Sequence, residues 1–217
     1  IAVLADLHTG SPHNDLEKLQ DIVQAANRAQ PDLVLLAGDF VIHGVVGGHF
    51  IEPEASARVL RSLQAPLGVY AVLGNHDWWF DGTRVRKALE AEGIPVLEDR
   101  AIPLMFHHTS IWLAGVSDFW EAAHDVRRAL SGVDETSPVI VVTHNPDVFP
   151  EIPGRVTLTI AGHTHGGQVA VPGWGRPVVP SQFGERYAIG HIVEGGRHLF
   201  VSTGIGTSIL PVRFRVP

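Results

Sequence analysis

The chain has 217 residues, of which 45% are hydrophobic and 18% are charged, with a formal net charge of −7 and no cysteine. This length supports a core that needs neither disulfides nor a structural metal, so we expect residues 1–217 to form a single domain. The lack of cysteine excludes disulfide scaffolds, thiolate metal sites and cysteine nucleophiles. The acidic balance argues against a partner that is a long nucleic acid, and no apolar run reaches the roughly 18 residues of a membrane span.

Short apolar runs alternate with helical periodicity along the first part of the chain. A helix is predicted to open at Asn14, with Glu17 as its capping partner, and to end before Pro31. Further helices are predicted from Pro53, over 82–92 and over 120–130. The predicted strands are 1–5, 33–37, 68–73, 94–97, 102–106, 111–114, 138–142 and 156–161, and the tail from Gln168 reads as strands joined by turns. This order predicts a mixed α/β sandwich.

Five of the predicted strands end in polar clusters. The clusters are Asp6-Leu7-His8, Gly38-Asp39, Gly74-Asn75-His76-Asp77, Thr143-His144-Asn145 and Gly162-His163-Thr164-His165. Each cluster alone is explained by turn residues or by a hydrogen-bonded histidine. Together they are expected at one place, because ligands of such folds collect beyond the carboxyl ends of the strands. In extended backbone, residues i and i+2 point the same way, so Asp-x-His and His-x-His can each present two ligands to one pocket.

The clusters supply seven potential metal donors. These are Asp6, His8, Asp39, Asn75, His144, His163 and His165. Seven donors exceed what a single ion uses and suit two ions that share a carboxylate. Imidazole and carboxylate ligands without thiolate favour Mn²⁺, Fe²⁺, Zn²⁺ or Co²⁺ over Ca²⁺ and Mg²⁺, and of these we favour Mn²⁺.

These ordered blocks resemble the calcineurin-like metallophosphoesterases, and they extend from Asp6 to His165. The resemblance implies a four-layer αββα sandwich with a dinuclear metal centre at its strand ends. It implies that Asp6, His8 and His165 hold one metal, that Asn75, His144 and His163 hold the second, and that Asp39 bridges them. It further implies that His76 contacts the scissile phosphate and protonates the leaving oxygen, with Asp77 orienting His76.

The tail is similar to one branch of that family. The similarity rests on residues 162–169, 178–184, 204–208 and 211–214. This branch is usually membrane-associated and contains phosphodiesterases of lipid-linked substrates, including a lineage of UDP-2,3-diacylglucosamine hydrolases. The resemblance therefore implies a small-molecule or lipid-linked phosphoester substrate and peripheral contact with a membrane. Members usually carry an N-terminal anchor, which the given sequence does not contain. We therefore expect a cytoplasmic protein, or a membrane-associated one if an anchor has been removed.

The predicted function is metal-dependent hydrolysis of a phosphodiester or pyrophosphate by in-line attack of a hydroxide held between the metals. One alternative is a nuclease or cyclic-nucleotide phosphodiesterase that uses the same site. Another is a binding scaffold that has lost catalysis, although the intact donor set argues for an enzyme. Among the other residues, His43 or His49 is a candidate substrate contact. The aromatic run Trp78-Trp79-Phe80 is expected to form either core or pocket wall, with adjacent rings turned to opposite sides.

Overall fold

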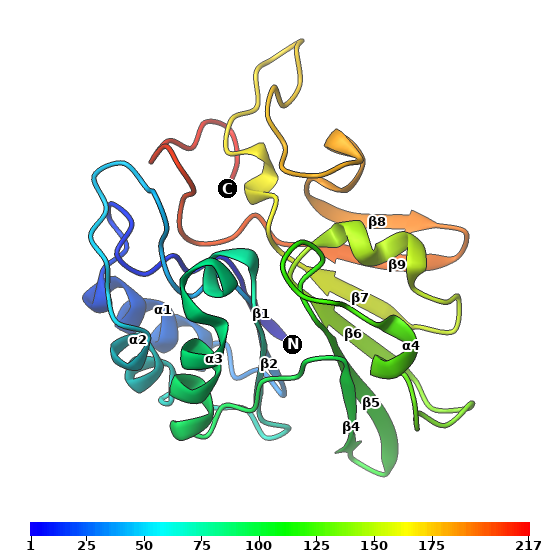
Figure 1. The fold of residues 1–217 in the computed structure, drawn as a ribbon. Helices are drawn as coiled ribbons and strands as arrows, with labels where there is room; N and C mark the ends of the chain where they lie inside the picture. The colour runs from blue at the N-terminus through cyan, green and yellow to red at the C-terminus, as the bar shows by residue number, and fades with distance from the viewer.

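Two β-sheets stand between two layers of helices in the computed structural model, which describes residues Ile1–Pro217 (Figure 1). The first sheet is parallel and has the order β1-β2-β3, with bounds Ala2–Leu4, Val34–Ala37 and Val69–Val72. The second has the order β4-β5-β6-β7-β9-β8. Its strands are Arg100–Phe106, Thr109–Val116, Val139–Thr143, Leu158–Ala161, Arg197–Val201 and Gly190–Glu194 in that order.

The helices cover the outer faces of the sheets. α1 (Leu16–Arg28), α2 (Pro53–Leu60) and α3 (Asn75–Ala91) pack on the first sheet. α4 (Val126–Ala129) and the 3₁₀ helix η1 (Pro146–Glu151) pack on the second. Two more 3₁₀ helices, η2 (His165–Gly167) and η3 (Gly184–Tyr187), lie in the tail. None of the helices combines the length and the apolar character needed to cross a membrane.

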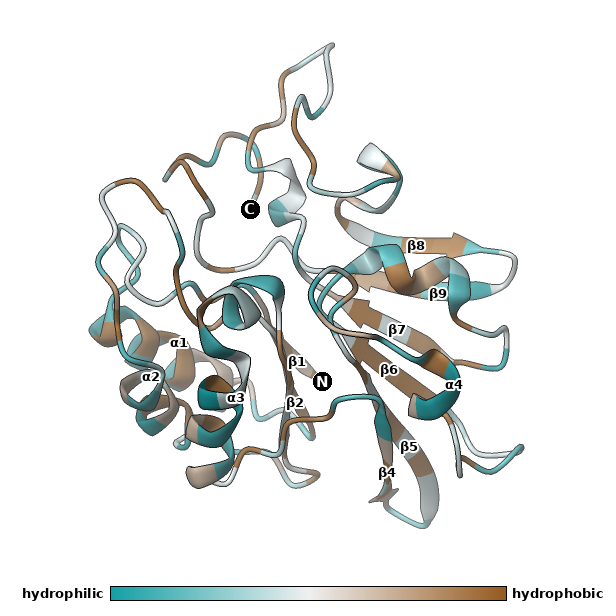
Figure 2. Ribbon diagram, viewed as in Figure 1, coloured by the Kyte–Doolittle hydropathy of each residue, from teal (hydrophilic) through white to brown (hydrophobic).

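Three hydrophobic cores lie between the four layers. Because successive side chains of a strand point to opposite faces, neighbouring residues of one strand join different cores. On β2, Leu36 joins the core beneath the helices, whereas its neighbour Leu35 joins the core between the two sheets. On β6, Val141 faces α4 and η1, whereas Val142 faces the first sheet. Because the central strands β2 and β6 are buried on both faces, they are almost continuously apolar (Figure 2). The expected αββα sandwich is confirmed.

Several predicted elements differ in their bounds. Asp15, rather than Asn14, caps α1 by accepting a hydrogen bond from the Lys18 N–H, while the Asn14 amide donates to the Leu7 carbonyl. The strand expected at 94–97 makes only one bridge, between Val96 and Ala71. Pro95 lies within it and has no N–H to donate to a ladder.

Two predicted helices also change. The one expected at 120–130 shrinks to α4, because the Asp118 carboxylate accepts hydrogen bonds from the N–H groups of Trp120 and Glu121 and folds them into a turn. The one expected at 82–92 begins earlier, at Asn75, and kinks at Asp81, where φ is −170°. The third polar cluster is therefore the first turn of α3 and not a loop.

Candidate metal centre

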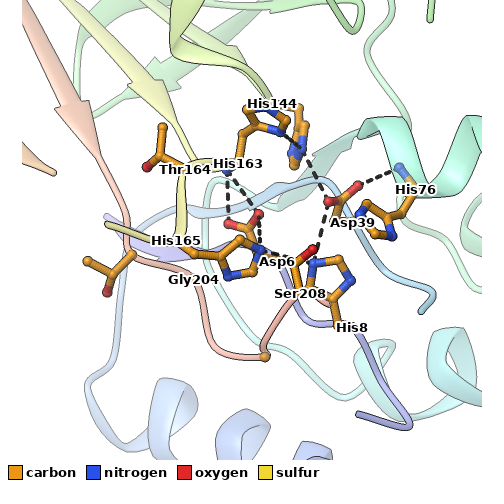
Figure 3. Close-up of polar contacts among 12 residues, drawn as sticks. Asp6, His8, Asp39, His76, His144, His163, Thr164, His165, Gly204 and Ser208 are labelled. Carbon is orange, nitrogen blue, oxygen red and sulfur yellow. Dashed lines mark hydrogen bonds and ion pairs between the residues drawn. The ribbon is translucent and has the colours of Figure 1, made fainter. Parts of the chain in front are cut away.

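All seven predicted donors lie in one connected cluster beyond the carboxyl ends of β1, β2, β6 and β7 and at the start of α3 (Figure 3). Three sets of side chains each bring their ligand atoms within 4.8 Å of one another. The sets are Asp6–His8–His165, His8–Asp39–His76 and Asp39–His144–His163. Asn75 joins the third set, since its Oδ1 lies 3.1 Å from His144 Nε2.

Asp39 occupies the middle of the cluster. Its Oδ2 lies 3.5 Å from His8 Nε2 and 3.3 Å from His144 Nε2, so one carboxylate oxygen faces two of the sets. Its Oδ1 accepts a hydrogen bond of 2.9 Å from the backbone N–H of His76, at the N-terminus of α3. A helix N-terminus stabilises a carboxylate in its ionised form, which is the form that binds metal.

Two of the histidines are oriented by backbone carbonyls. His8 Nδ1 lies 3.1 Å from the Val41 carbonyl oxygen, and His144 Nδ1 lies 2.8 Å from that of Ala37. These carbonyls can only accept, so each Nδ1 carries a proton, and Nε2 is the nitrogen that presents a lone pair to the cluster when the imidazole is neutral. Metal-binding histidines are typically held this way. The donor set therefore fits divalent cations.

The backbone at the site is unusual for these residue types. Five of the donors have positive φ: Asp6 at 50°, His8 at 40°, Asp39 at 58°, His163 at 71° and His165 at 49°. Such backbone costs about 1–3 kcal/mol per residue and persists at functional sites where the surrounding structure enforces it. The extended i, i+2 geometry predicted for Asp-x-His and His-x-His is therefore wrong. Asp6 and His8 do share one set, whereas His163 and His165 belong to different sets.

Burial and charge set the protonation states in the absence of metal. Burial by itself would lower the pKa of His144, but the Asp39 carboxylate raises it to about 10. Burial would raise the pKa of Asp39, yet the neighbouring imidazoles of His144 and His76 hold it well below its usual value. Burial lowers the pKa of His76 to about 4, against the opposing effect of Asp39. His144 thus carries a proton that a bound cation must displace.

Asp77 does not have the role expected of it. Its carboxylate accepts hydrogen bonds from four backbone N–H groups, at 2.9 Å from Gly74 and Asp39, 2.8 Å from Phe40 and 3.3 Å from Val41. The Nδ1 atom of His76 has no hydrogen-bond partner. Asp77 follows His76 in the first turn of α3, where its side chain points back to the start of the helix. It therefore fixes the loop after β2 and does not orient His76.

The tail segments 204–208 and 211–214, on which the resemblance to one branch rests, contact the site, a position that the sequence alone did not assign to them. Gly204 has φ of 70°, and a β-carbon there would lie 2.6 Å from that of Asp6, so only glycine allows this approach. The Gly206 N–H donates to the Asp6 carbonyl at 2.7 Å. Arg213 donates to the carbonyls of Thr203, Gly204 and Gly206 and holds this loop in place. No short-range spacing links these positions to Asp6.

The aromatic run after the third cluster is helical, so its rings do not alternate as strand residues would. Trp78 packs against the core beneath the helices, and Phe80 lies 4.8 Å from Phe50 between ring centroids. Trp79 turns to the site, 4.7 Å from the His76 ring and 5.7 Å from the His43 ring. His43 is thus at the edge of the site, whereas His49 donates its backbone N–H to Gly10.

The order and geometry of these residues agree with a comparison against known proteins. The profile described as calcineurin-like phosphoesterase matches residues 1–167. The chain belongs to the calcineurin-like phosphoesterase family. It is therefore a metal-dependent phosphoester hydrolase.

Similar proteins extend beyond the matched region. The uncharacterised metallophosphoesterase YkuE of Bacillus subtilis (strain 168) is 32% identical, over 99% of this chain and 74% of its own length. The phosphodiesterase YaeI of Escherichia coli (strain K12) is 31% identical, over 95% of this chain and 75% of its own.

Solved structures share the fold at low identity. A hypothetical protein from Thermus thermophilus has a TM-score of 0.54 and 18% identity, with 93% of this phosphoesterase and 75% of that chain covered. A putative 5′-nucleotidase from Staphylococcus aureus also has a TM-score of 0.54, at 12% identity, with 93% and 48% covered.

Proposed function

We propose that this phosphoesterase hydrolyses phosphodiesters with two divalent cations, for which Mn²⁺ is the favoured metal. Asp6, His8 and His165 hold one ion, and Asn75, His144 and His163 hold the other. Asp39 is shared by the two. Such a pair, when bound, lowers the pKa of water and neutralises the phosphoryl oxygens.

The position of Asp39 carries this proposal. One of its oxygens faces His8 Nε2 at 3.5 Å and His144 Nε2 at 3.3 Å, and these histidines belong to different ligand sets. A single ion would leave one of the two sets of donors unused. The buried lone pairs of that set would then lack any partner, which is unfavourable.

His76 is proposed as the proton donor to the leaving oxygen. Its side chain is neutral at neutral pH because burial lowers its pKa, and its Nδ1 has no hydrogen-bond partner. Its ring lies 4.6 Å from that of His8, within reach of a phosphate at the cations. As a general acid, His76 must carry the imidazolium proton. Burial opposes this protonated form, whereas the negative charge of a bound phosphate favours it. His76 also belongs to the set with His8 and Asp39, so a role as a metal ligand is the alternative to be tested.

The substrate is proposed to be a lipid-linked phosphodiester, and two observations support this. YaeI, a relative, is named a phosphodiesterase. The tail beside the site exposes a group of large apolar side chains, which we call the apolar rim: Trp174, Val178, Ile209, Leu210, Val212 and Phe214. Backbone hydrogen bonds from Ala170 to Phe214 and from Phe214 to Gln168 tie the rim to the chain just after His165.

Charge supports a peripheral contact of the same rim with an anionic membrane. No Asp or Glu occurs between Glu151 and Glu185 or after Glu194, although the whole chain has a net charge of −7. The rim segments carry Arg176 and Arg215 instead. Apolar side chains flanked by cations favour the interface of an anionic bilayer.

A substrate panel tests the proposed function. Metal-stripped protein is reloaded with Mn²⁺, Zn²⁺, Fe²⁺ or Co²⁺ and assayed on a phosphomonoester, a phosphodiester, a cyclic nucleotide and single-stranded DNA. We expect metal-dependent turnover that favours the phosphodiester. Preference for the cyclic nucleotide or for DNA would establish the alternative phosphodiesterase or nuclease, and no turnover with any metal would favour a scaffold.

A further inference from the structure

Two tryptophans border the metal centre with half-exposed rings. Trp79 lies on α3 with its ring centroid 4.7 Å from that of His76. Trp120 follows β5 and packs edge-on against His163, 4.3 Å away with the two rings at 89°. Each of the two tryptophan residues is 43% exposed. His76 and His163 lie on different sides of Asp39 (Figure 3), so the two indoles contact the site at two places.

A hydrogen-bonded turn joins the two indoles. The Trp79 Nε1–H donates to Glu121 Oε1 at 2.7 Å. Glu121 directly follows Trp120, and the N–H groups of both donate to Asp118 Oδ2, at 2.8 and 2.9 Å. Asp118 is fully buried at the end of β5. The sequence separation between Trp79 and Glu121 is 42 residues, so this connection is tertiary.

Packing in the hydrophobic cores does not account for the positions of these two exposed rings. Trp78, next to Trp79, packs against the core beneath the helices, whereas Trp79 leaves a large apolar surface open beside a polar site. Trp120 does the same from the other sheet. Large aromatic rings that remain exposed around polar groups are typical of ligand sites, where a ligand completes their burial.

We propose that Trp79 and Trp120 form a subsite for an aromatic ring carried by the substrate, on the ester arm that stays attached to phosphorus. This inference rests on the proposed phosphodiesterase function. The ring contacts one or both indole faces, while the phosphate lies at the cations next to His76 and His163. Glu121 sets the position of Trp79, and Asp118 sets that of Trp120 through the turn. Trp79, Trp120 and Glu121 therefore determine substrate preference without taking part in bond breaking.

Two substrates with the same leaving group test the subsite. Bis(p-nitrophenyl) phosphate and methyl p-nitrophenyl phosphate both release p-nitrophenolate, and they differ only in the arm that remains. Trp79→Ala and Trp120→Ala are expected to raise KM about tenfold for the first substrate and to leave the second within about twofold. Trp79→Phe and Trp120→Phe keep a ring and should restore most of the difference. Phe106→Ala removes a similarly exposed ring at the end of β4, 39% exposed and outside both the metal centre and the apolar rim, and is the matched control.

Glu121 provides an independent variant that keeps both indoles. Glu121→Gln retains an acceptor for the Trp79 indole and should behave like the wild type. Glu121→Ala releases that indole and should raise KM for the bis-aryl substrate alone. Metal analysis of every variant must still give the wild-type content, because loss of metal would mean that the rings only support the ligands.

A binding measurement separates this inference from the proposed function. Nitroaromatic rings quench tryptophan fluorescence on contact. Titration with p-nitrobenzylphosphonate, whose P–C bond is not hydrolysed and whose ring stays attached to phosphorus, therefore reports ring binding without turnover. Wild-type quenching should saturate, and it should weaken in Trp79→Phe and Trp120→Phe. Absence of saturable quenching, or equal KM changes for both substrates, would overturn the subsite while leaving phosphodiesterase activity intact. Saturable quenching without turnover of either substrate would instead contradict the proposed phosphodiesterase function.

Discussion

One oxygen of the Asp39 carboxylate accepts a hydrogen bond of 2.9 Å from the backbone N–H of His76, while the other oxygen faces the imidazoles of His8 and His144. This contact ties the start of α3 to the end of β2. It also places the proposed general acid next to the proposed bridging ligand. Variants of these two residues should therefore have separable effects.

Asp39→Ala should abolish binding of two metals per chain. The change removes the carboxylate between His8 and His144, so bound cations would face each other without the shared negative charge. Metal analysis after reloading with Mn²⁺ should approach two equivalents for the wild type and fall below one for the variant. Asp32→Ala, which removes an exposed carboxylate, is the control. A wild-type stoichiometry that never exceeds one would rule out the dinuclear site.

His76→Ala should keep the metals and lose kcat. General acids contribute roughly 10²–10⁴-fold, so a loss of that order is expected for a diester with an alkoxide leaving group. The loss should be smaller when the leaving group is nitrophenolate, which needs no proton. Loss of metal from this variant would assign His76 to the ligands of the set with His8 and Asp39.

Asp77→Ala should destabilise the fold more than it affects proton transfer. Its carboxylate satisfies four backbone N–H groups, and each buried polar group left unpaired costs about 1–3 kcal/mol. Urea unfolding of the metal-free protein should show a loss of several kcal/mol, whereas His76→Ala should unfold near the wild-type midpoint. A stable Asp77→Ala protein with low kcat would restore the orienting role expected from the sequence.

Ionisation of the buried Glu98 carboxyl group should lower the free energy of unfolding as the pH rises. Burial raises its pKa from 4.5 to about 7, although Arg86, 3.2 Å away, opposes this. The folded chain then keeps a proton that the unfolded chain has lost, so stability declines from about pH 4.5 to about 7 and stays lower above it. Glu98→Gln should remove this decline, on the order of 3 kcal/mol. Urea unfolding midpoints of the wild type and of Glu98→Gln, measured at pH 5 and pH 8 without metal, test this loss of stability. An equal change in midpoint between the two pH values for both proteins would contradict the role of Glu98.

The apolar rim should bind anionic vesicles. Wild-type protein is expected to sediment with phosphatidylglycerol vesicles more than with phosphatidylcholine vesicles, and added salt should weaken the binding. Leu210→Asp should reduce it severalfold. Val193→Asp changes an equally exposed apolar residue on β8 and is the control, because that strand lies outside the rim. An equal loss of vesicle binding in both variants would show that the apolar rim is not the membrane-binding surface.

Local sequence pattern predicted a mixed α/β sandwich and the candidate donors at its strand ends, whereas the four-layer arrangement followed from the family resemblance. Strand alternation and buried apolar runs predicted β2, β6 and β7 to within one or two residues. The polar residues that follow those strands are the candidate metal donors, since parallel strands that are buried on both faces leave their ends as the place for ligands. Pro53 likewise marked the start of α2.

Only the tertiary structure decided which neighbours these residues meet. The His163 N–H donates to Asp6 across 157 residues of sequence, and Gly204 approaches the same carboxylate from the tail. Asp77 anchors the loop after β2 and is not a partner of His76, because α3 begins about two turns earlier than its apolar periodicity indicated. Trp120 lies at the site because its N–H group is hydrogen-bonded to Asp118 in a turn, where the sequence predicted a helix. Such contacts arise from the packing of distant segments, which the periodicity of any one segment does not record.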